Sequence, residues 1–206
     1  MRHLVVDLET LSNDIRHGVI LSIGAMSFAM DEEIVAPADD MYQRCIDNYR
    51  YFYTTVKRMS QVVKYRFAID PETLEWWMAT DEKKALLHEL LANPHALDIH
   101  EALLLFKQWI EHNQAVDANE EVELWSHGVT YDCMHLSEKW PVVFPGTSFN
   151  DVVPFRKMRD TRTLFAAYKA KMGAAVEYAP TVRKHHALED AYLTAKSIQT
   201  AWYELT

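Results

Sequence analysis

Leu4-Val5-Val6-Asp7-Leu8, followed by Glu9 and Thr10, stands near the beginning of the chain. This short apolar run predicts a buried β-strand. Because side chains alternate between the two faces of a strand, Asp7 and Glu9 lie on the same face. Two carboxylates on one face of a central strand cost free energy unless they bind a cation. Taken alone, the residues from Asp7 to Thr10 fit equally a strand end that dips into solvent, so both interpretations stay open.

Beyond this strand, the sequence predicts strands first and then strands interleaved with helices. The further strands are expected at residues 19–28, 51–56 and 121–125. The helices are expected at residues 71–79, 81–92, 98–112, 130–140, 161–172 and 187–203. The helix 130–140 is expected to end before Pro141, and the helix 161–172 at Gly173. This order is typical of an α/β fold with a central mixed sheet.

The composition is that of one ordinary globular domain over residues 1–206, with 49% hydrophobic and 25% charged residues. The acidic segment 31–50 either extends a hairpin or forms an insertion. Cys45 and Cys133 are too few for a disulfide scaffold and fit a reducing compartment. No apolar run has the length of a signal peptide or a membrane span, so we expect a cytoplasmic location and no membrane partner.

The formal net charge of −9 lowers the expectation of a general nucleic-acid binder, which usually carries a basic surface. The charge is uneven, because residues 152–184 hold eight basic residues and only two acidic ones. The basic residues are Arg156, Lys157, Arg159, Arg162, Lys169, Lys171, Arg183 and Lys184. This segment directly precedes His185, where it can meet a phosphate backbone at the mouth of a site; the alternative is a solvated helix face with a loop.

Two later acidic residues are as ambiguous as Asp7 and Glu9. Asp132 follows the turn 126–128 in the first turn of an expected helix, where an acid also complements the helix dipole. Asp190 shares a helix face with mostly apolar residues, where an unpaired carboxylate is costly and a metal or a cationic partner is the natural explanation. Four residues separate Asp190 from His185, which lies in the preceding loop.

Together these residues, in this order, resemble the DEDDh 3′-5′ exonuclease superfamily. That superfamily includes the proofreading subunit of the bacterial replicative polymerase, RNase T and oligoribonuclease, and the resemblance covers residues 4–201. Further segments are similar to the branch of the phage DexA-type exonuclease and related bacterial enzymes: residues 20–25, 72–77, 125–128 and 159–164. This branch more often has Asn where the present chain has His127, which puts a contact of that residue in doubt.

The resemblance implies an RNase H-like fold, a mixed five-stranded sheet flanked by helices. It implies four carboxylate ligands for two Mg²⁺ ions or for Mn²⁺, namely Asp7, Glu9, Asp132 and Asp190. Hard oxygen donors of this kind suit these cations. It also implies that His185 is the general base, because counting back from Asp190 by the family spacing leads to His185 and not to His186.

The implied reaction is hydrolysis at the 3′ end of single-stranded DNA or RNA, with DNA ahead of RNA, and release of nucleoside 5′-monophosphates. Substrate contacts are expected from Leu8, Thr10, Trp77, His127, Arg159 and Arg162. Neighbouring helical residues cannot face the same way, so one of Trp76 and Trp77 is expected in the core and the other is free to stack on a base. At least one of Arg159 and Arg162 is expected to pair with an acid.

Two alternatives remain. The first is a nanoRNase that acts on very short oligonucleotides, which suits a modest basic patch in an acidic chain. The second is a catalytically weak adaptor that uses the same fold to bind nucleic acid or protein, although nothing in a pure adaptor requires the full set of catalytic-type residues. As a partner we expect either a second copy in a homodimer or a larger nucleic-acid-processing complex, and the DexA-type similarity suggests a phage or prophage setting.

Overall fold

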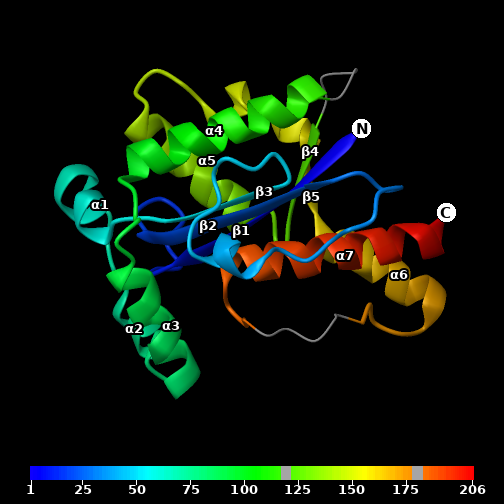
Figure 1. Ribbon diagram of the computed structural model, residues 1–206, viewed down its shortest axis with the longest axis horizontal. Helices are drawn as coiled ribbons and strands as arrows, with labels where there is room; N and C mark the ends of the chain where they lie inside the picture. Colours follow the sequence, from blue (N-terminus) through cyan, green and yellow to red (C-terminus); the bar gives the residue numbers. More distant parts are fainter. Residues whose placement is uncertain (117–121, 178–182) are drawn as a thin grey trace.

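A mixed five-stranded sheet lies at the centre of the computed structural model, which describes residues 1–116, 122–177 and 183–206 (Figure 1). The strand order is β3-β2-β1-β4-β5. Strand β1 pairs antiparallel with β2 and parallel with β4, while β3 is antiparallel to β2 and β5 is parallel to β4. The strands are β1 (Arg2–Thr10), β2 (Ile20–Phe28), β3 (Tyr51–Thr55), β4 (Val122–Ser126) and β5 (Met158–Asp160). The expected mixed five-stranded sheet is confirmed, although β5, with three residues, is too short to stand out in the sequence.

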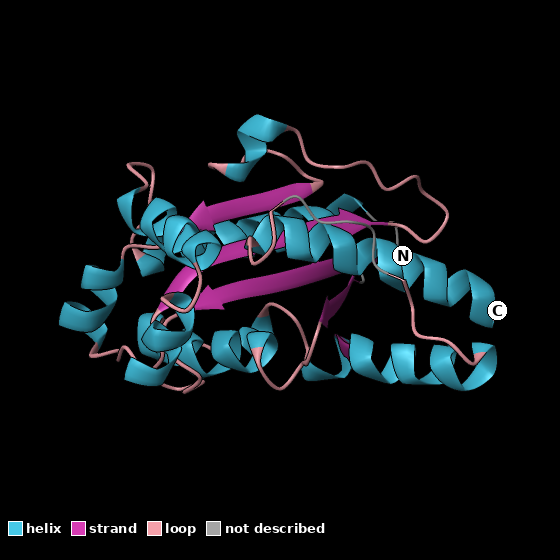
Figure 2. Ribbon diagram, turned by 90° about the horizontal axis from the view of Figure 1, so that it is seen from below, coloured by secondary structure: helices cyan, strands magenta, loops and turns pink. Residues whose placement is uncertain are grey.

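Helices cover both faces of this sheet, as Figures 1 and 2 show. Helices α4 (Ile99–Val116) and α5 (Asp132–Val143) pack on one face, and α7 (Ala187–Leu205), with α6 (Thr161–Met172) beside it, on the other. Three further helices lie at one end of the sheet. They are α1 (Arg58–Tyr65), α2 (Pro71–Trp77) and α3 (Asp81–Ala92).

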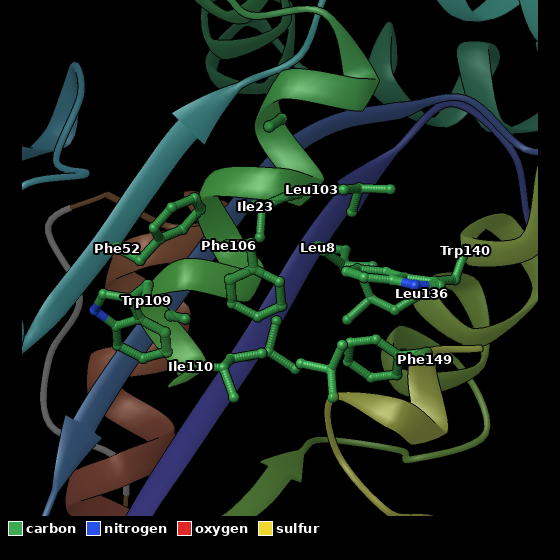
Figure 3. Close-up of a cluster of buried hydrophobic side chains, with 14 of the residues drawn as sticks. Leu8, Ile23, Phe52, Leu103, Phe106, Trp109, Ile110, Leu136, Trp140 and Phe149 are labelled. Carbon is green, nitrogen blue, oxygen red and sulfur yellow. The ribbon is translucent and has the colours of Figure 1, made fainter. Parts of the chain in front are cut away.

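The alternation along β1 divides the core into two layers. Leu4, Val6 and Leu8 pack with α4 and α5 in a cluster rich in aromatic rings, part of which Figure 3 shows. Val5 points to the opposite face and packs with α7. Because side chains alternate along a strand, Asp7 also belongs to the α7 face. The main helix of that face is therefore the element that can complete a site with the acidic residues of β1.

Helix α5 does not end before Pro141, as the sequence suggested, but continues to Val143 with the proline inside it. Proline removes one backbone hydrogen bond from a helix. Here Trp140 and Val143, on either side of Pro141, are 2% and 5% exposed and pack in the core. Burial of these two side chains outweighs the missing hydrogen bond.

The acidic segment 31–50 connects β2 with β3. It contains a short 3-10 helix, Asp39–Tyr42, and then returns to the sheet, where the Cys45 N–H donates to the Tyr53 carbonyl at 2.8 Å. Its bridge to Tyr53 is antiparallel and lies on the edge strand β3. Within the described ranges, no helix is long and apolar enough to cross a membrane.

Candidate active site

Carboxylates from distant parts of the chain meet where β1 passes under the beginning of α7. Asp7, Glu9 and Asp190 each offer an oxygen atom, and these atoms lie within 4.8 Å of one another. Asp7 and Glu9 come from one face of β1, and Asp190 from the first turn of α7. The structure thus brings together three of the four acids that the sequence singled out.

The close approach of α7 to the sheet depends on Gly24, which lies beside Asp7 in the β1–β2 register. A Cβ atom at Gly24 would lie 2.2 Å from the carbonyl carbon of Ala187 and 2.3 Å from the backbone nitrogen of Leu188. Only glycine leaves room for a helix backbone at this distance. The absent side chain therefore allows Asp190 to reach the carboxylates of β1.

Asp132 joins the cluster from the other side. It begins α5, is only 4% exposed, and its Oδ1 accepts a hydrogen bond of 3.2 Å from the Leu8 N–H. Since β1 and β4 are parallel, their carboxyl ends meet at one edge of the sheet, and the turn after β4 delivers Asp132 there. Leu8, which the sequence predicted as a substrate contact, thus holds this carboxylate through its backbone N–H, and its contact with substrate stays a prediction.

Burial and mutual repulsion dominate the electrostatics of the cluster. Burial, with repulsion from neighbouring carboxylates, raises the pKa of Asp7 and Glu9 well above the usual range. Burial also raises the pKa of Asp132 to about 7 and that of Asp190 to about 6. Both effects oppose the ionised form, and a bound divalent cation relieves both. The donor set, carboxylate oxygens alone, therefore fits a hard cation such as Mg²⁺ or Mn²⁺.

His185 lies at the rim of this cluster with a left-handed backbone, φ 65°. Its backbone N–H donates to the Asp190 carboxylate, and its ring meets the edge of the Trp76 ring at 5.0 Å between centroids. Burial, together with the charges of Lys184 and Lys83, lowers the pKa of the imidazole. His185 is thus half-buried, with a ring that is neutral and able to accept a proton at pH 7.

The neighbouring His186 has a different environment. It is 1% exposed, and its Nε2–H donates to the Tyr42 carbonyl at 3.0 Å. The ring packs against Tyr53 at 4.4 Å, and burial lowers its pKa to about 4. His186 is therefore a core residue that caps α7, while His185 remains beside the carboxylates.

A cavity of about 410 Å³, which we call the Glu9 pocket, opens beside the cluster. It is lined by Leu8, Glu9, Thr10, Asn13, Glu72, Thr73, Trp76, Trp77 and Tyr131. Trp76 is 43% exposed, and the Lys83 ammonium lies 3.5 Å from the centroid of its ring. On the far wall, the Tyr131 hydroxyl lies 2.7 Å from Thr10 Oγ1. The pocket thus combines aromatic rings and hydroxyl groups with the carboxyl groups of Glu9 and Glu72.

Trp77, which the sequence singled out as a substrate contact, lines this pocket but is almost fully buried. It is 1% exposed, and its indole N–H donates to the Thr10 carbonyl at 2.9 Å. Trp77 thus belongs to the core and supports the end of β1, and the exposed ring is that of Trp76. Helical geometry separates the two side chains, but the sequence alone does not say which of them is buried.

The two arginines of the basic segment also differ. The guanidinium of Arg159 pairs with Glu123 at 2.6 Å and donates to the Arg156 carbonyl at 2.6 Å. The guanidinium of Arg162 instead lies against Gly128, in the turn before Asp132. Arg159 is therefore the arginine with the structural ion pair, and Arg162 is the one that faces the acidic cluster.

The rest of the basic segment does not form one surface. The Lys171 ammonium donates to the carbonyls of Glu204 and Leu205 at the end of α7, and the Arg183 guanidinium lies over the Tyr42 ring. His127, the residue after β4, places its Nδ1 2.9 Å from Thr161 Oγ1. Only part of the predicted positive charge is therefore available near the carboxylates.

Sequence reasoning missed three residues of the site. Lys83 stacks on Trp76 from the next helix, and nothing in the sequence pairs these two positions. Tyr131 and Asn13 line the Glu9 pocket from loops. Tyr131 could have been found from its place directly before Asp132, whereas Asn13 carries only a turn signal.

A comparison with known protein families identifies the family of this chain. Residues 2–202 match the family described as the 3′-5′ exoribonuclease Rv2179c-like domain. The chain belongs to this family. An Rv2179c-like domain therefore spans nearly the whole sequence, and the chain carries a 3′-5′ exonuclease fold of the kind the resemblance implied. A comparison with curated proteins finds no match.

Solved structures support the fold of this Rv2179c-like domain. Cell-death related nuclease 4 (CRN-4) is similar with a TM-score of 0.62 and 13% identity, over 98% of this chain and 64% of that chain. Exonuclease I from Methylocaldum szegediense gives a TM-score of 0.55 at 13% identity, over 97% of this chain and 40% of its own. The RNase domain of yeast Pop2 gives 0.52 at 12% identity, over 98% and 75%. The chain thus spans less than two thirds of the length of CRN-4 and of the Methylocaldum szegediense exonuclease I, and the likeness shows a shared RNase H-like exonuclease fold.

Proposed function

We propose that this chain is a DEDDh-type 3′-5′ exonuclease that removes nucleoside 5′-monophosphates from single-stranded nucleic acid by a two-metal mechanism. The observation that carries the proposal is the meeting of Asp7, Glu9 and Asp190 within 4.8 Å, with Asp132 beside them. Buried carboxylates with raised pKa values and without a matching number of cations are typical of a functional site and not of a stable core. Residues 1–206 then act as one exonuclease domain.

Asp7, Glu9, Asp132 and Asp190 would hold Mg²⁺ or Mn²⁺. When bound, such ions activate a water molecule and neutralise charge on the leaving oxygen of an in-line displacement at phosphorus. The Leu8 N–H keeps Asp132 turned toward β1, and Gly24 allows the close approach that brings in Asp190. The chain itself thus contributes a preformed set of buried carboxylate oxygens.

His185 would accept the proton of the attacking water at its imidazole ring. Its lowered pKa supports this role, because the ring is neutral at pH 7. The bond from its backbone N–H to Asp190 and the contact with Trp76 restrict where the ring can lie. His186, buried and bonded to Tyr42, is not available for the same task.

The Glu9 pocket would receive the nucleotide at the 3′ end. Its base would stack on the exposed face of Trp76, and the hydroxyl pair of Thr10 and Tyr131 would lie close to the sugar. Arg162 would meet a phosphate beside Asp132. These contacts account for a 3′-terminal nucleotide without requiring a basic surface over the whole protein.

The sugar of the substrate is the point on which the sequence and the family description differ. The sequence placed DNA ahead of RNA, whereas the family description names exoribonucleases, which supports RNA and short oligonucleotides as much as DNA. The DexA-type branch, with its phage or prophage setting, and a homodimer or a larger complex stay predictions. We retain RNA and DNA as substrates that one assay must compare.

The test is a time course on 3′- and 5′-labelled single-stranded RNA and DNA, with Mg²⁺ and with EDTA. We expect release of mononucleotides from the 3′ end only when Mg²⁺ is present. Asp190→Asn is expected to lose at least a thousandfold in rate, and Asp81→Asn, an acid 99% exposed at the start of α3, is the matched control. Undiminished activity in Asp190→Asn contradicts the metal assignment, and tight binding without hydrolysis favours the adaptor.

A further inference from the structure

A second hollow, of about 310 Å³, is lined by the turn after β4, by α6 from Arg162 to Lys169, and by residues 175 and 176 after that helix; we call it the α6 pocket. Its walls include His127, Arg162, Phe165, Lys169 and Val176. Among the described residues, it shares no lining residue with the Glu9 pocket. The α6 pocket is therefore a separate hollow, and of the roles proposed above only the phosphate contact of Arg162 touches it.

The α6 pocket is connected with the acidic cluster through Arg162. A Cβ atom at Gly128 would lie 3.0 Å from the central guanidinium carbon of Arg162, so this group packs directly on the turn that leads to Asp132. Its positive charge acts electrostatically on Asp132. A ligand that fills the pocket and reaches Arg162 therefore arrives at the edge of the carboxylate site.

The residues that line the α6 pocket restrict the chemical class of ligand that it can bind. Arg162, Phe165 and Lys169 follow one another at intervals of three and four residues, so they lie on one face of α6. The Phe165 ring is 6.1 Å from the ring of His127, and Val176 adds a buried aliphatic wall. An apolar floor with a cation at each end suits a flat ring attached to phosphates.

Other occupants fit less well. A free phosphate could pair with the cations at the rim of the pocket. The floor of the pocket, however, is apolar, whereas an anion needs hydrogen-bond donors. An apolar peptide segment would leave two cations, Arg162 and Lys169, without partners. A nucleotide suits both parts of the pocket, because its base can pack on the apolar floor and its phosphate can pair with the cations at the rim.

We propose that the α6 pocket binds the second nucleotide from the 3′ end, with its base over Phe165 and its phosphate between Arg162 and Lys169. This assignment rests on the proposed function, which places the terminal nucleotide in the Glu9 pocket and the bond that is cut at the carboxylates. The protein therefore contacts the last two nucleotides of its substrate.

The test compares two substrates that differ only on the leaving side. One is a single-stranded oligonucleotide with a thymidine at its 3′ end, and the other is the p-nitrophenyl ester of thymidine 5′-monophosphate, which has no second nucleoside. For Phe165→Ala and Lys169→Ala, the ratio of kcat/KM on the oligonucleotide to kcat/KM on the ester is expected to fall about tenfold, mainly through KM. Phe165→Leu, which keeps an apolar side chain in the packing, is expected to lower the ratio as well.

Matched controls remove the same groups elsewhere. Phe155→Ala deletes a ring that is 74% exposed, and Lys107→Ala deletes an equal charge on α4. Both are expected to keep the wild-type ratio. A ratio that does not change in the Phe165 and Lys169 variants, or that changes equally in the controls, overturns the α6 assignment. A wild-type protein that hydrolyses neither substrate overturns the proposed function and this assignment with it.

Discussion

The hydroxyl of Tyr42 donates a hydrogen bond to the carboxylate of Glu189, the residue directly before Asp190. The carbonyl of the same tyrosine accepts the Nε2–H of His186. One residue of the acidic segment 31–50 thus holds the beginning of α7 at two points. The segment that the sequence left without a role positions the helix that completes the carboxylate cluster.

Tyr42→Phe is therefore expected to lower the free energy of unfolding by about 2 kcal/mol, because a buried carboxylate loses its donor. It is also expected to weaken Mg²⁺ binding several-fold, since the first turn of α7 is held less firmly. Urea denaturation and calorimetric titration measure these effects. The matched control is Tyr51→Phe, which removes a hydroxyl bonded to the Val35 carbonyl at 2.6 Å. Equal losses of metal affinity in both variants would remove the special role of Tyr42.

The metal-free protein is expected to lose stability as the pH rises from about 4 to about 7. In this range the folded protein still holds protons on Asp132 and Asp190, whose pKa values are about 7 and about 6, while the unfolded chain has released them. The folded state binds more protons, so the free energy of unfolding falls with rising pH.

Urea denaturation at pH 5.0 and 7.5 in EDTA checks this dependence, and Mg²⁺ is expected to restore stability at pH 7.5. Asp132→Asn is expected to flatten the pH dependence, whereas the exposed Asp81→Asn keeps it. A metal-free wild-type protein that is more stable at pH 7.5 than at 5.0 would show that the carboxylates are not strained by burial.

The two adjacent tryptophans are expected to respond in opposite ways. Trp76→Ala should raise KM for single-stranded substrate about tenfold with little change in stability, because its ring is 43% exposed. Trp77→Phe should lower the free energy of unfolding by about 1–2 kcal/mol, because the bond to the Thr10 carbonyl is lost. Steady-state kinetics and urea denaturation of both variants are the measurements. A KM effect in Trp77→Phe larger than in Trp76→Ala would restore the sequence-based choice.

Gly24→Ala is expected to separate α7 from the sheet, with a loss of more than about 2 kcal/mol and of most Mg²⁺ affinity, because the new Cβ would meet the Ala187 backbone at 2.2 Å. Gly146→Ala is the matched control. Gly146 has φ 83° and no atom within 4 Å of an added Cβ, so this change costs only about 1 kcal/mol of backbone strain. If both variants bind Mg²⁺ like the wild type, the close approach is not what places Asp190.

Regular elements with clear ends could be predicted from the sequence. Helix α3 covers Asp81–Ala92 as expected, with the Thr80 hydroxyl accepting from the Lys83 N–H at its start. Helix α6 ends at Gly173, whose left-handed φ of 75° suits a glycine. Helix α1 and strand β5 were not predicted, because short elements depend on what they pack against more than on their own pattern.

The candidate site, too, was predictable from the sequence in part only. The order of the acids along the chain was enough to single out Asp7, Glu9 and Asp190, and these residues do lie together, while their catalytic roles stay predictions. What sequence reasoning could not supply depends on side-chain direction across tertiary contacts. The bond from Trp77 to Thr10 and the hold of Tyr42 on α7 each join residues far apart in the sequence, so no local pattern announces them.

The meeting of Asp7 and Asp190 in one cluster has a consequence for how the protein folds. These residues come from the first strand and the last helix, and contacts of such long sequence separation form late because closing a long loop is entropically costly. A partly folded chain can hold its sheet and still lack the third oxygen donor. The exonuclease activity proposed above is therefore expected to appear only after α7 has docked, so a chain that has not finished folding is expected to be inactive.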